Sequence, residues 1–222
     1  MDDKTRYRMK ATWLVCLATL LGSSGCFGLN RGAPPIQHYV LEGGHSHEVA
    51  AQPRDSADLA IALRRPQIAS YLDVPFIVVR RGPHQIGLTE LHRWGEHLGE
   101  GINRAVAGHL FEQGTFRAVD VAPWAPRERH DYLIQLHVLR FEGQLPEEEA
   151  TLEGGVHVVA TWEIIRPEDG RVLTRGTTDY RVDNWTVGDY NSLVTLLDAG
   201  LGVLAEDLAA GLRSMRSSSP EP

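Results

Sequence analysis

Cysteine, lysine and long apolar runs are all scarce in this sequence. Its 222 residues include two cysteines, Cys16 and Cys26, and no lysine beyond Lys10. The apolar run at residues 11–21 is shorter than the ~20 residues that a helix needs to cross a bilayer. A formal charge of −7 argues against binding to nucleic-acid phosphates. The length suits one ordinary domain. Cys16 lies inside the apolar run and would be removed with a signal peptide, so one cysteine would remain and the core must hold without disulfides.

The sequence also lacks the residue patterns that most catalytic sites need. It contains no P-loop, no Gly-x-Ser-x-Gly elbow and no complete dinucleotide-binding fingerprint. His45 and His47 lie close together, but no carboxylate or cysteine stands at the spacing of a known zinc site. The acidic run at residues 147–149 is typical of a solvated loop. We therefore expect no enzymatic activity, no metal site and no cofactor.

The first 25 residues have the layout of a secretory signal peptide. Basic residues up to Lys10 precede the apolar run, and the small residues 22–25 follow it. Ser24, Gly25 and Cys26 resemble a bacterial lipobox, in which the cysteine becomes the first residue and carries a lipid. We predict a signal peptide at residues 1–25 and lipidation of Cys26. The alternative is a soluble periplasmic protein with one free thiol, which is a liability in an oxidising compartment.

Residues 26–35 contain glycine and proline without an apolar period, and this composition predicts a short tether between the lipid and the folded domain. Phe27, rather than an aspartate, follows Cys26. An aspartate at that position favours retention in the inner membrane where the enterobacterial sorting rule applies. Resemblance to sorted lipoproteins therefore implies the periplasmic face of the outer membrane. Retention in the inner membrane is the alternative, because the sorting rule varies between lineages.

Beyond the tether, most segments have the pattern of β-strands. Apolar and polar residues alternate there as they do in half-buried strands. The sequence around Gly82 and Pro83 predicts a hairpin turn, and the sequence from Pro167 to Gly170 predicts a second turn. The predicted strands are residues 38–41, 58–63, 76–80, 84–89, 116–121, 132–141, 156–164 and 172–180.

Two segments have the apolar spacing of helices. The first runs from Leu98 to Leu110, and the second from Tyr190 to Leu212 with Asp189 as its cap. The second stripe could form a coiled coil with a partner, but covering a sheet of its own domain is the commoner use. We predict a two-layer α+β fold in which two main helices pack on one face of a largely antiparallel sheet. The domain should span residues 36–213, followed by a disordered tail at 214–222.

Arginine and tryptophan gather near the predicted hairpin. After residue 25 every basic residue is an arginine, and the formal charge is −9 because residues 1–25 contribute +2. Arginine and tryptophan are frequent at the energetic centres of protein interfaces. The cluster is therefore our candidate for a partner or self-assembly surface, although Trp94 could instead fill the space between hairpin and helix. Its members are Arg80, Arg81, Arg93 and Trp94.

Several motifs in a fixed order resemble the PqiC family of ABC-type transport auxiliary lipoproteins. The resemblance covers roughly residues 36–212, and its most specific piece is residues 71–80 followed by Arg93-Trp94. The remaining pieces are Tyr39-Val40-Leu41, Pro66, Gly95-Glu96-His97-Leu98, Asp131-Tyr132 and Phe141-Glu142-Gly143.

This resemblance implies a non-catalytic subunit of an intermembrane lipid transport system. Such a subunit would dock an MCE-type protein, which spans the periplasm, at the outer membrane, and it would work with an inner-membrane transport component. Self-association is a further possibility. The alternative is an envelope scaffold or assembly lipoprotein with no role in lipid transport. The sequence does not indicate which lipid is carried.

Overall fold

A computed structural model describes residues 34–43, 59–113, 116–125, 129–148 and 151–218. Cys26, His45 and His47, as well as the signal peptide and most of the tether, lie outside these residues. Ile36–Pro222 forms one compact unit, separate from Met1–Pro35. The elements in chain order are β1 (Gln37–Tyr39), β2 (Leu59–Leu63), β3 (Gln67–Ile68), β4 (Phe76–Arg81), β5 (Gln85–Trp94), α2 (Leu98–Glu112), β6 (Phe116–Val121), β7 (Tyr132–Leu145), β8 (Glu153–Ile165), β9 (Val172–Thr186) and α3 (Tyr190–Ser218).

The strands of the described residues form one mixed sheet, which is organised around β7. On one side β7 pairs with β8, and β8 pairs with β9, in long antiparallel ladders. On the other side β7 pairs in parallel with β2 at its start and with β4 at its end. The hairpin β4–β5 then adds β1 as a parallel outer strand. The predicted α+β class with a largely antiparallel sheet is confirmed, and the short parallel pairings are an addition to it.

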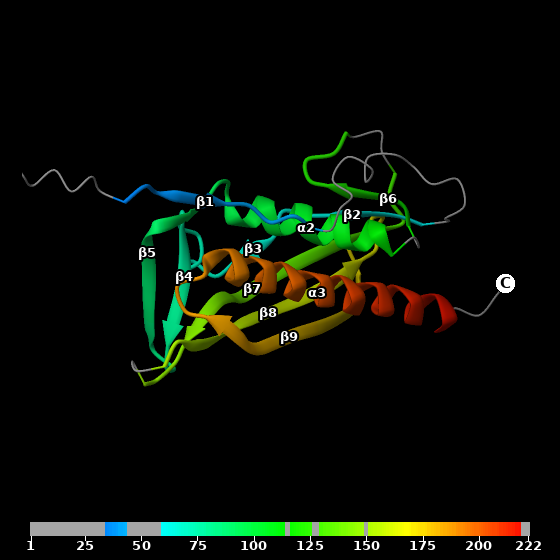
Figure 1. Ribbon diagram of the computed structural model, residues 1–222. Coiled ribbons are helices and arrows are strands. Elements are labelled where there is room, and N and C mark those ends of the chain that lie inside the picture. Colours follow the sequence, from blue (N-terminus) through cyan, green and yellow to red (C-terminus); the bar gives the residue numbers. More distant parts are fainter. Residues whose placement is uncertain (1–33, 44–58, 114–115, 126–128, 149–150, 219–222) are drawn as a thin grey trace, which may run out of the picture. The chain divides into compact units, whose positions relative to one another are not determined.

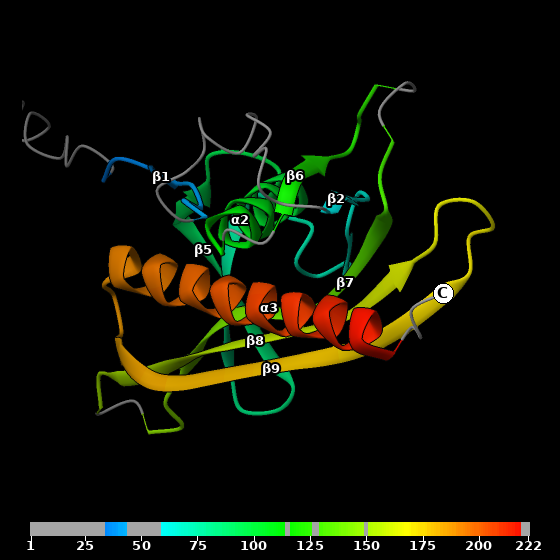
Figure 2. The same cartoon turned by 90° about the vertical axis from the view of Figure 1, so that its right-hand side faces the viewer.

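Both predicted helices are present and lie next to each other (Figures 1 and 2). In Figure 2, α3 lies over β8 and β9, while α2 lies beside it. The Asp189 carboxylate accepts a hydrogen bond from the Ser192 N–H at 3.1 Å, as expected of an N-cap. The leucines that step along α3 are almost completely buried, so this stripe covers the sheet of its own domain. They are Leu197, Leu201, Leu204, Leu208 and Leu212.

Several predicted boundaries were wrong, and the elements are longer than predicted. Strand β5 continues to Trp94 rather than ending at Thr89, because its last residues pair with β1. Strand β7 continues to Leu145 and strand β9 to Thr186, beyond the predicted ends at residues 141 and 180. Helix α3 continues to Ser218, so the segment predicted as a disordered tail from residue 214 begins inside this helix. These errors arose where pairing or helical continuity extends an element beyond its regular apolar pattern.

Candidate functional site

Two segments that are distant in sequence meet at a hollow in the surface. The first is the loop before β4, with Asp73, Val74 and Pro75, and the second runs from Trp94 to Leu98, between the end of β5 and the start of α2. The hollow has a volume of about 700 Å³. The first segment and Trp94 belong to the most specific motif of the sequence, and residues 95–98 form another of the motifs that resemble the PqiC family. We call this feature the motif hollow.

Backbone hydrogen bonds hold the two walls of the motif hollow together. The Trp94 N–H donates to the Pro75 carbonyl oxygen at 2.9 Å, and the Gly95 N–H donates to the Tyr39 carbonyl oxygen at 2.7 Å. A Cβ atom on Gly95 would lie 3.2 Å from Cγ1 of Val40, which is a tight contact. The small residue at position 95 therefore lets β1 lie close against this wall.

Buried apolar side chains line the inner side of the motif hollow. Trp94 is only 6% exposed, and its ring packs against Phe141 with the ring centroids 5.9 Å apart. Leu98, the first residue of α2, is also buried. These contacts fix the position of the motif hollow relative to the sheet.

The charges at the rim of the motif hollow are of two kinds. The Glu96 carboxylate accepts two hydrogen bonds from the Arg104 guanidinium, and this contact raises the pKa of Arg104 above its ordinary value. Asp73 is exposed, and within the described part of the chain no side chain pairs with its carboxylate. The motif hollow therefore offers one unneutralised negative charge beside an apolar wall.

No catalytic arrangement is found at this site. The motif hollow contains no serine or cysteine, and His97 is exposed at the start of α2. Within the described residues, no three His, Cys, Asp or Glu side chains are grouped so that they could hold a metal ion. Glu147 and Glu148 are exposed in the connection between β7 and β8.

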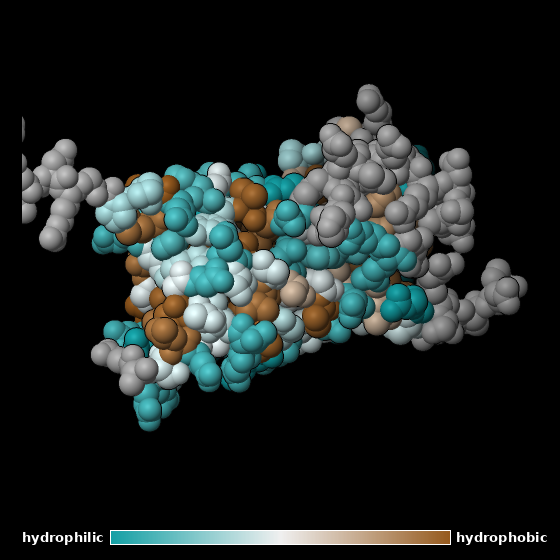
Figure 3. All heavy atoms as spheres, viewed as in Figure 1, coloured by the Kyte–Doolittle hydropathy of each residue, from teal (hydrophilic) through white to brown (hydrophobic). Residues whose placement is uncertain are grey.

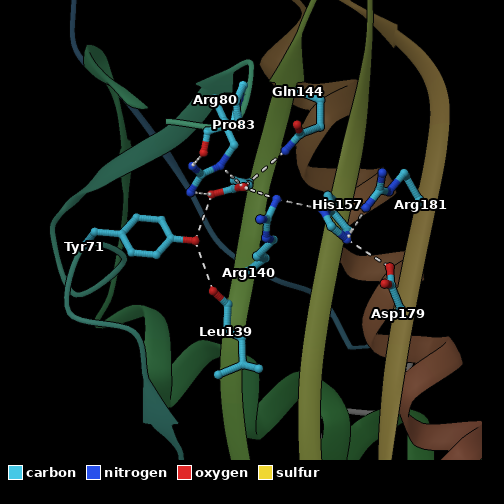
Figure 4. Close-up of polar contacts among 10 residues, drawn as sticks. Tyr71, Arg80, Pro83, Leu139, Arg140, Gln144, His157, Asp179 and Arg181 are labelled. Carbon is cyan, nitrogen blue, oxygen red and sulfur yellow. Dashed lines mark hydrogen bonds and ion pairs between the residues drawn. The ribbon is translucent and has the colours of Figure 1, made fainter. Parts of the chain in front are cut away.

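A second polar site lies on the sheet face opposite the helices (Figure 4). Its centre is Glu142 on β7, which is completely buried. Arg80 on β4 binds both carboxylate oxygens, with Nη2 donating to Oε2 at 3.1 Å. The Tyr71 hydroxyl donates to Oε2 at 2.9 Å, and Gln144 Nε2 donates to Oε1 at 3.2 Å. Three neighbouring side chains thus satisfy this buried charge.

The surroundings of Glu142 change the acidity of its partners. The hydrogen bond to Glu142 raises the pKa of Arg80. Burial, followed by the hydrogen bond to Glu142, raises the pKa of Tyr71. Arg80 also lies over the Tyr71 ring, 5.4 Å from its centroid. Tyr71, Arg80 and Glu142 all come from the motifs that resemble the PqiC family, and the structure shows that they bind one another.

His157 on β8 lies next to this site in Figure 4 and is also buried. Its Nε2 lies 2.9 Å from an oxygen of Asp179 and 3.0 Å from Nη2 of Arg181. Arg140 approaches its Nδ1 at 3.3 Å. Burial is the main cause that lowers the pKa of His157.

The four residues predicted to bind a partner all lie on the β4–β5 hairpin, but they are not equally accessible. Arg80 is engaged by Glu142, and Trp94 is buried with its ring packed against Phe141. Arg81 donates to the Pro146 carbonyl oxygen at 2.9 Å and is partly exposed. Arg93, which is also partly exposed, lies over the Phe76 ring at 5.1 Å. Partner binding by these residues stays a prediction. Of the four side chains, those of Arg81 and Arg93 are accessible enough to contact a partner.

Sequence reasoning missed the motif hollow and the role of Glu142. A glutamate in the apolar pattern of β7 was a signal that the strand carries a buried charge, but nothing local identified Arg80 as its partner.

No helix in the described part of the chain is both long enough and apolar enough to span a membrane.

Comparisons with known proteins identify a family and its fold. The model of the ABC-type transport auxiliary lipoprotein component family matches residues 39–209. The crystal structure of protein XCC0632 from Xanthomonas campestris is similar, with 16% sequence identity over 75% of this chain and 91% of that one and a TM-score of 0.59. A crystal structure of an uncharacterised protein has 13% identity over 81% of this chain and 99% of its own, with a TM-score of 0.60. No curated protein matches the sequence.

Proposed function

Because this chain belongs to the family of ABC-type transport auxiliary lipoprotein components, we propose that it is the lipid-anchored accessory subunit of an intermembrane lipid transport system. Family membership makes it an accessory of a transport system. The proposal adds an anchor at Cys26 in the outer membrane and an MCE-type periplasm-spanning protein as its partner. The domain works by binding rather than by chemistry, and the associated inner-membrane component supplies the energy for transport.

The motif hollow is the observation that carries this proposal. Residues 73–75 of the most specific motif line it together with Trp94 and the Gly95-Glu96-His97-Leu98 motif, at the open end of the β4–β5 hairpin. A shared surface feature explains why both segments have unusual sequences, whereas packing alone would need only apolar residues of suitable size. The free carboxylate of Asp73 suits a partner segment that presents a basic side chain beside an apolar one.

A photo-crosslinking amino acid at Asp73 tests this docking surface in cells. The matched control carries the same amino acid at Thr177, an exposed position on β9. We expect capture of an MCE-type protein from position 73 and not from position 177. Equal capture from both positions, or none from position 73, would show that the motif hollow is not the docking surface. Capture of a second copy instead would indicate self-association.

Charge reversal gives a second test of the same surface. Asp73→Arg should weaken complex formation, because the partner would then meet a positive charge. Glu168→Arg makes the same change of net charge in the exposed turn between β8 and β9 and should have no effect. Co-purification of the partner with each variant measures the difference.

Mass spectrometry of the mature protein tests the anchor. The expected product begins at Cys26 and carries acyl chains, and two or more chains make membrane residence stable. Membrane fractionation then distinguishes the outer from the inner membrane. If the anchored protein forms its complex but its deletion leaves lipid distribution between the membranes unchanged, the scaffold alternative replaces lipid transport.

A further inference from the structure

Exposed apolar side chains gather on two strands at one end of the domain. Among the described residues, the large apolar side chains with substantial exposure number seven, and five of these belong to β5 or flank β1. Each of the five is between 37% and 56% exposed. Figure 3 shows apolar residues at the margin of the molecule where β1 and β5 lie in Figure 1. The five are Ile36, Val40, Ile86, Leu88 and Leu91.

Strand register places most of these side chains on the face of the hairpin that points away from the core. Tyr39 and Trp94 are paired and buried, so the preceding pair, His38 and Arg93, faces the opposite way. Ile36 and Val40 lie two residues to either side of His38 and share its face.

The β4–β5 pairing extends this face along the hairpin. Arg93 pairs with Phe76, and Leu88 pairs with Val78, two residues further along β4, with a register shift in the ladder between these two pairs. Because Phe76 and Val78 are two residues apart on β4, their partners Leu88 and Arg93 share one side. Leu91 lies within the shifted part of β5, and its exposure rather than its register assigns it to the same surface. We call these side chains the β1–β5 patch, which consists of Ile36, His38, Val40, Ile86, Leu88, Leu91 and Arg93.

Arg93 is held in the β1–β5 patch by contacts within the hairpin and lies opposite His38 of β1. Its guanidinium lies over the Phe76 ring at 5.1 Å, and its Nε donates to the Glu90 carbonyl oxygen at 3.1 Å. Within the described residues, no acceptor is found for its Nη atoms. Glu90 is the single acidic residue of β5, so the patch has no excess of negative charge. Arginine held among aliphatic side chains suits the boundary of a bilayer, where its stem lies on acyl chains and its head reaches phosphate.

The position of the patch in the chain identifies its occupant. Ile36 follows Cys26 by ten residues, and ten residues span at most roughly 35 Å. If Cys26 carries the lipid, the bilayer surface is thus within reach of β1. β1 is also an outer strand of the sheet, and such an edge is normally covered or charged.

We infer that the β1–β5 patch rests on the lipid surface, with its aliphatic side chains in the headgroup region and Arg93 bound to lipid phosphate. This inference rests on the proposed anchor at Cys26. It assigns Arg93 to the membrane rather than to a protein partner. It also gives the domain a fixed orientation, so that the motif hollow, which shares Gly95 with this end of β1, opens close to the membrane.

Site-specific fluorescence tests the contact in the full lipoprotein. In the anchored protein the sulfur of Cys26 is blocked, so an introduced cysteine is the single site for an environment-sensitive dye. We would label Val40→Cys and Leu88→Cys, reconstitute each into phosphatidylethanolamine–phosphatidylglycerol vesicles, and add lipids with a quencher on the acyl chain. Ala210→Cys is the control, because it is exposed on α3 near the end of the helix that lies far from β5 in Figure 1.

We expect a shift of emission to shorter wavelength and quenching by the lipid for the labels at positions 40 and 88, and neither for position 210. In the Val40→Cys background, Arg93→Glu should reduce the quenching. If the vesicles hold the protein but the patch labels are not quenched, the inference is overturned while the anchor stands. Labelling of the protein without any introduced cysteine would show a free thiol at Cys26, which would overturn the anchor and the inference together.

Discussion

Arg80 and Glu142 form a bidentate ion pair although 62 residues separate them in the sequence, with Nη2 3.1 Å from Oε2. The pair joins β4 to β7 on the sheet face opposite the helices (Figure 4), and Glu142 has no contact with solvent. Removing one member of a buried pair leaves the other charge without compensation, whereas replacing both members costs much less. This asymmetry makes the pair testable.

Arg80→Met should therefore lower the free energy of unfolding by roughly 3 kcal/mol, as is typical of a broken buried pair. The double variant Arg80→Met, Glu142→Leu should be clearly more stable than the sum of the single changes predicts. Arg81→Met is the matched control, because Arg81 is partly exposed and donates to one carbonyl oxygen. Urea denaturation gives the free energy of unfolding of the unchanged protein, both single variants, the double variant and the control. Strict additivity of the two single changes would contradict the role of this pair.

Stability should fall in mild acid because of His157. Burial lowers the pKa of His157 in the folded protein, so the unfolded chain takes up a proton at a higher pH than the folded one does. The stabilisation is complete above about pH 6.5, the ordinary histidine pKa, and is lost as the pH falls below it. The charged side chains that face the ring are Asp179, Arg181 and Arg140.

His157→Gln should make the unfolding free energy less dependent on pH between roughly 5 and 7, where histidine titrates. Glutamine can keep a hydrogen bond to Asp179 but cannot be protonated. His84→Gln, at the exposed hairpin turn, is the control and should leave the dependence unchanged. His92 has a lowered pKa for the same reason, so part of the dependence should remain. A variant whose pH dependence equals that of the unchanged protein would show that His157 does not contribute.

Two glycine-to-alanine changes in helices should have opposite effects. Alanine is favoured over glycine inside a helix by ~1 kcal/mol. At Gly108 in α2, however, a Cβ atom would lie 2.1 Å from the Gly43 carbonyl oxygen, so Gly108→Ala should destabilise the protein. At Gly202 in α3 the nearest atom is 3.7 Å away, so Gly202→Ala should stabilise it. Thermal unfolding of both variants measures these changes in stability. A stabilised Gly108→Ala variant would show that position 108 does not lie close to the Gly43 carbonyl oxygen.

Trp94 and Arg93 are neighbours in the sequence, but their substitution should affect stability very differently, because Trp94 is buried and Arg93 is partly exposed. Trp94→Ala removes a buried ring and should cost ~3 to 5 kcal/mol, as large-to-small core changes do. Arg93→Ala removes one partly exposed contact with an aromatic ring and should cost less than ~1 kcal/mol. Circular dichroism during heating measures both. A fully stable Trp94→Ala variant would mean that Trp94 does not support the fold as described.

Local patterns in the sequence were enough to predict most elements. The leucine stripe of α3, the Asp189 cap and the turn at Gly170 each depend on residues within a few positions of one another. Such patterns reflect the periods of helix and strand, which act over short distances along the chain. The order of the family motifs along the sequence also indicated the family, and the family model matches residues 39–209.

The sequence by itself thus determined the class of the fold, its two helices and its family. Only the tertiary structure decided that Arg80 binds Glu142 and that Trp94 is buried against Phe141. These relationships depend on the parallel pairing of β4 with β7 and of β1 with β5, whereas residues 73–75 meet residues 94–98 at the open end of the antiparallel β4–β5 hairpin. Parallel partners are set by the packing of the whole chain rather than by a local turn, so no short stretch of sequence specifies them.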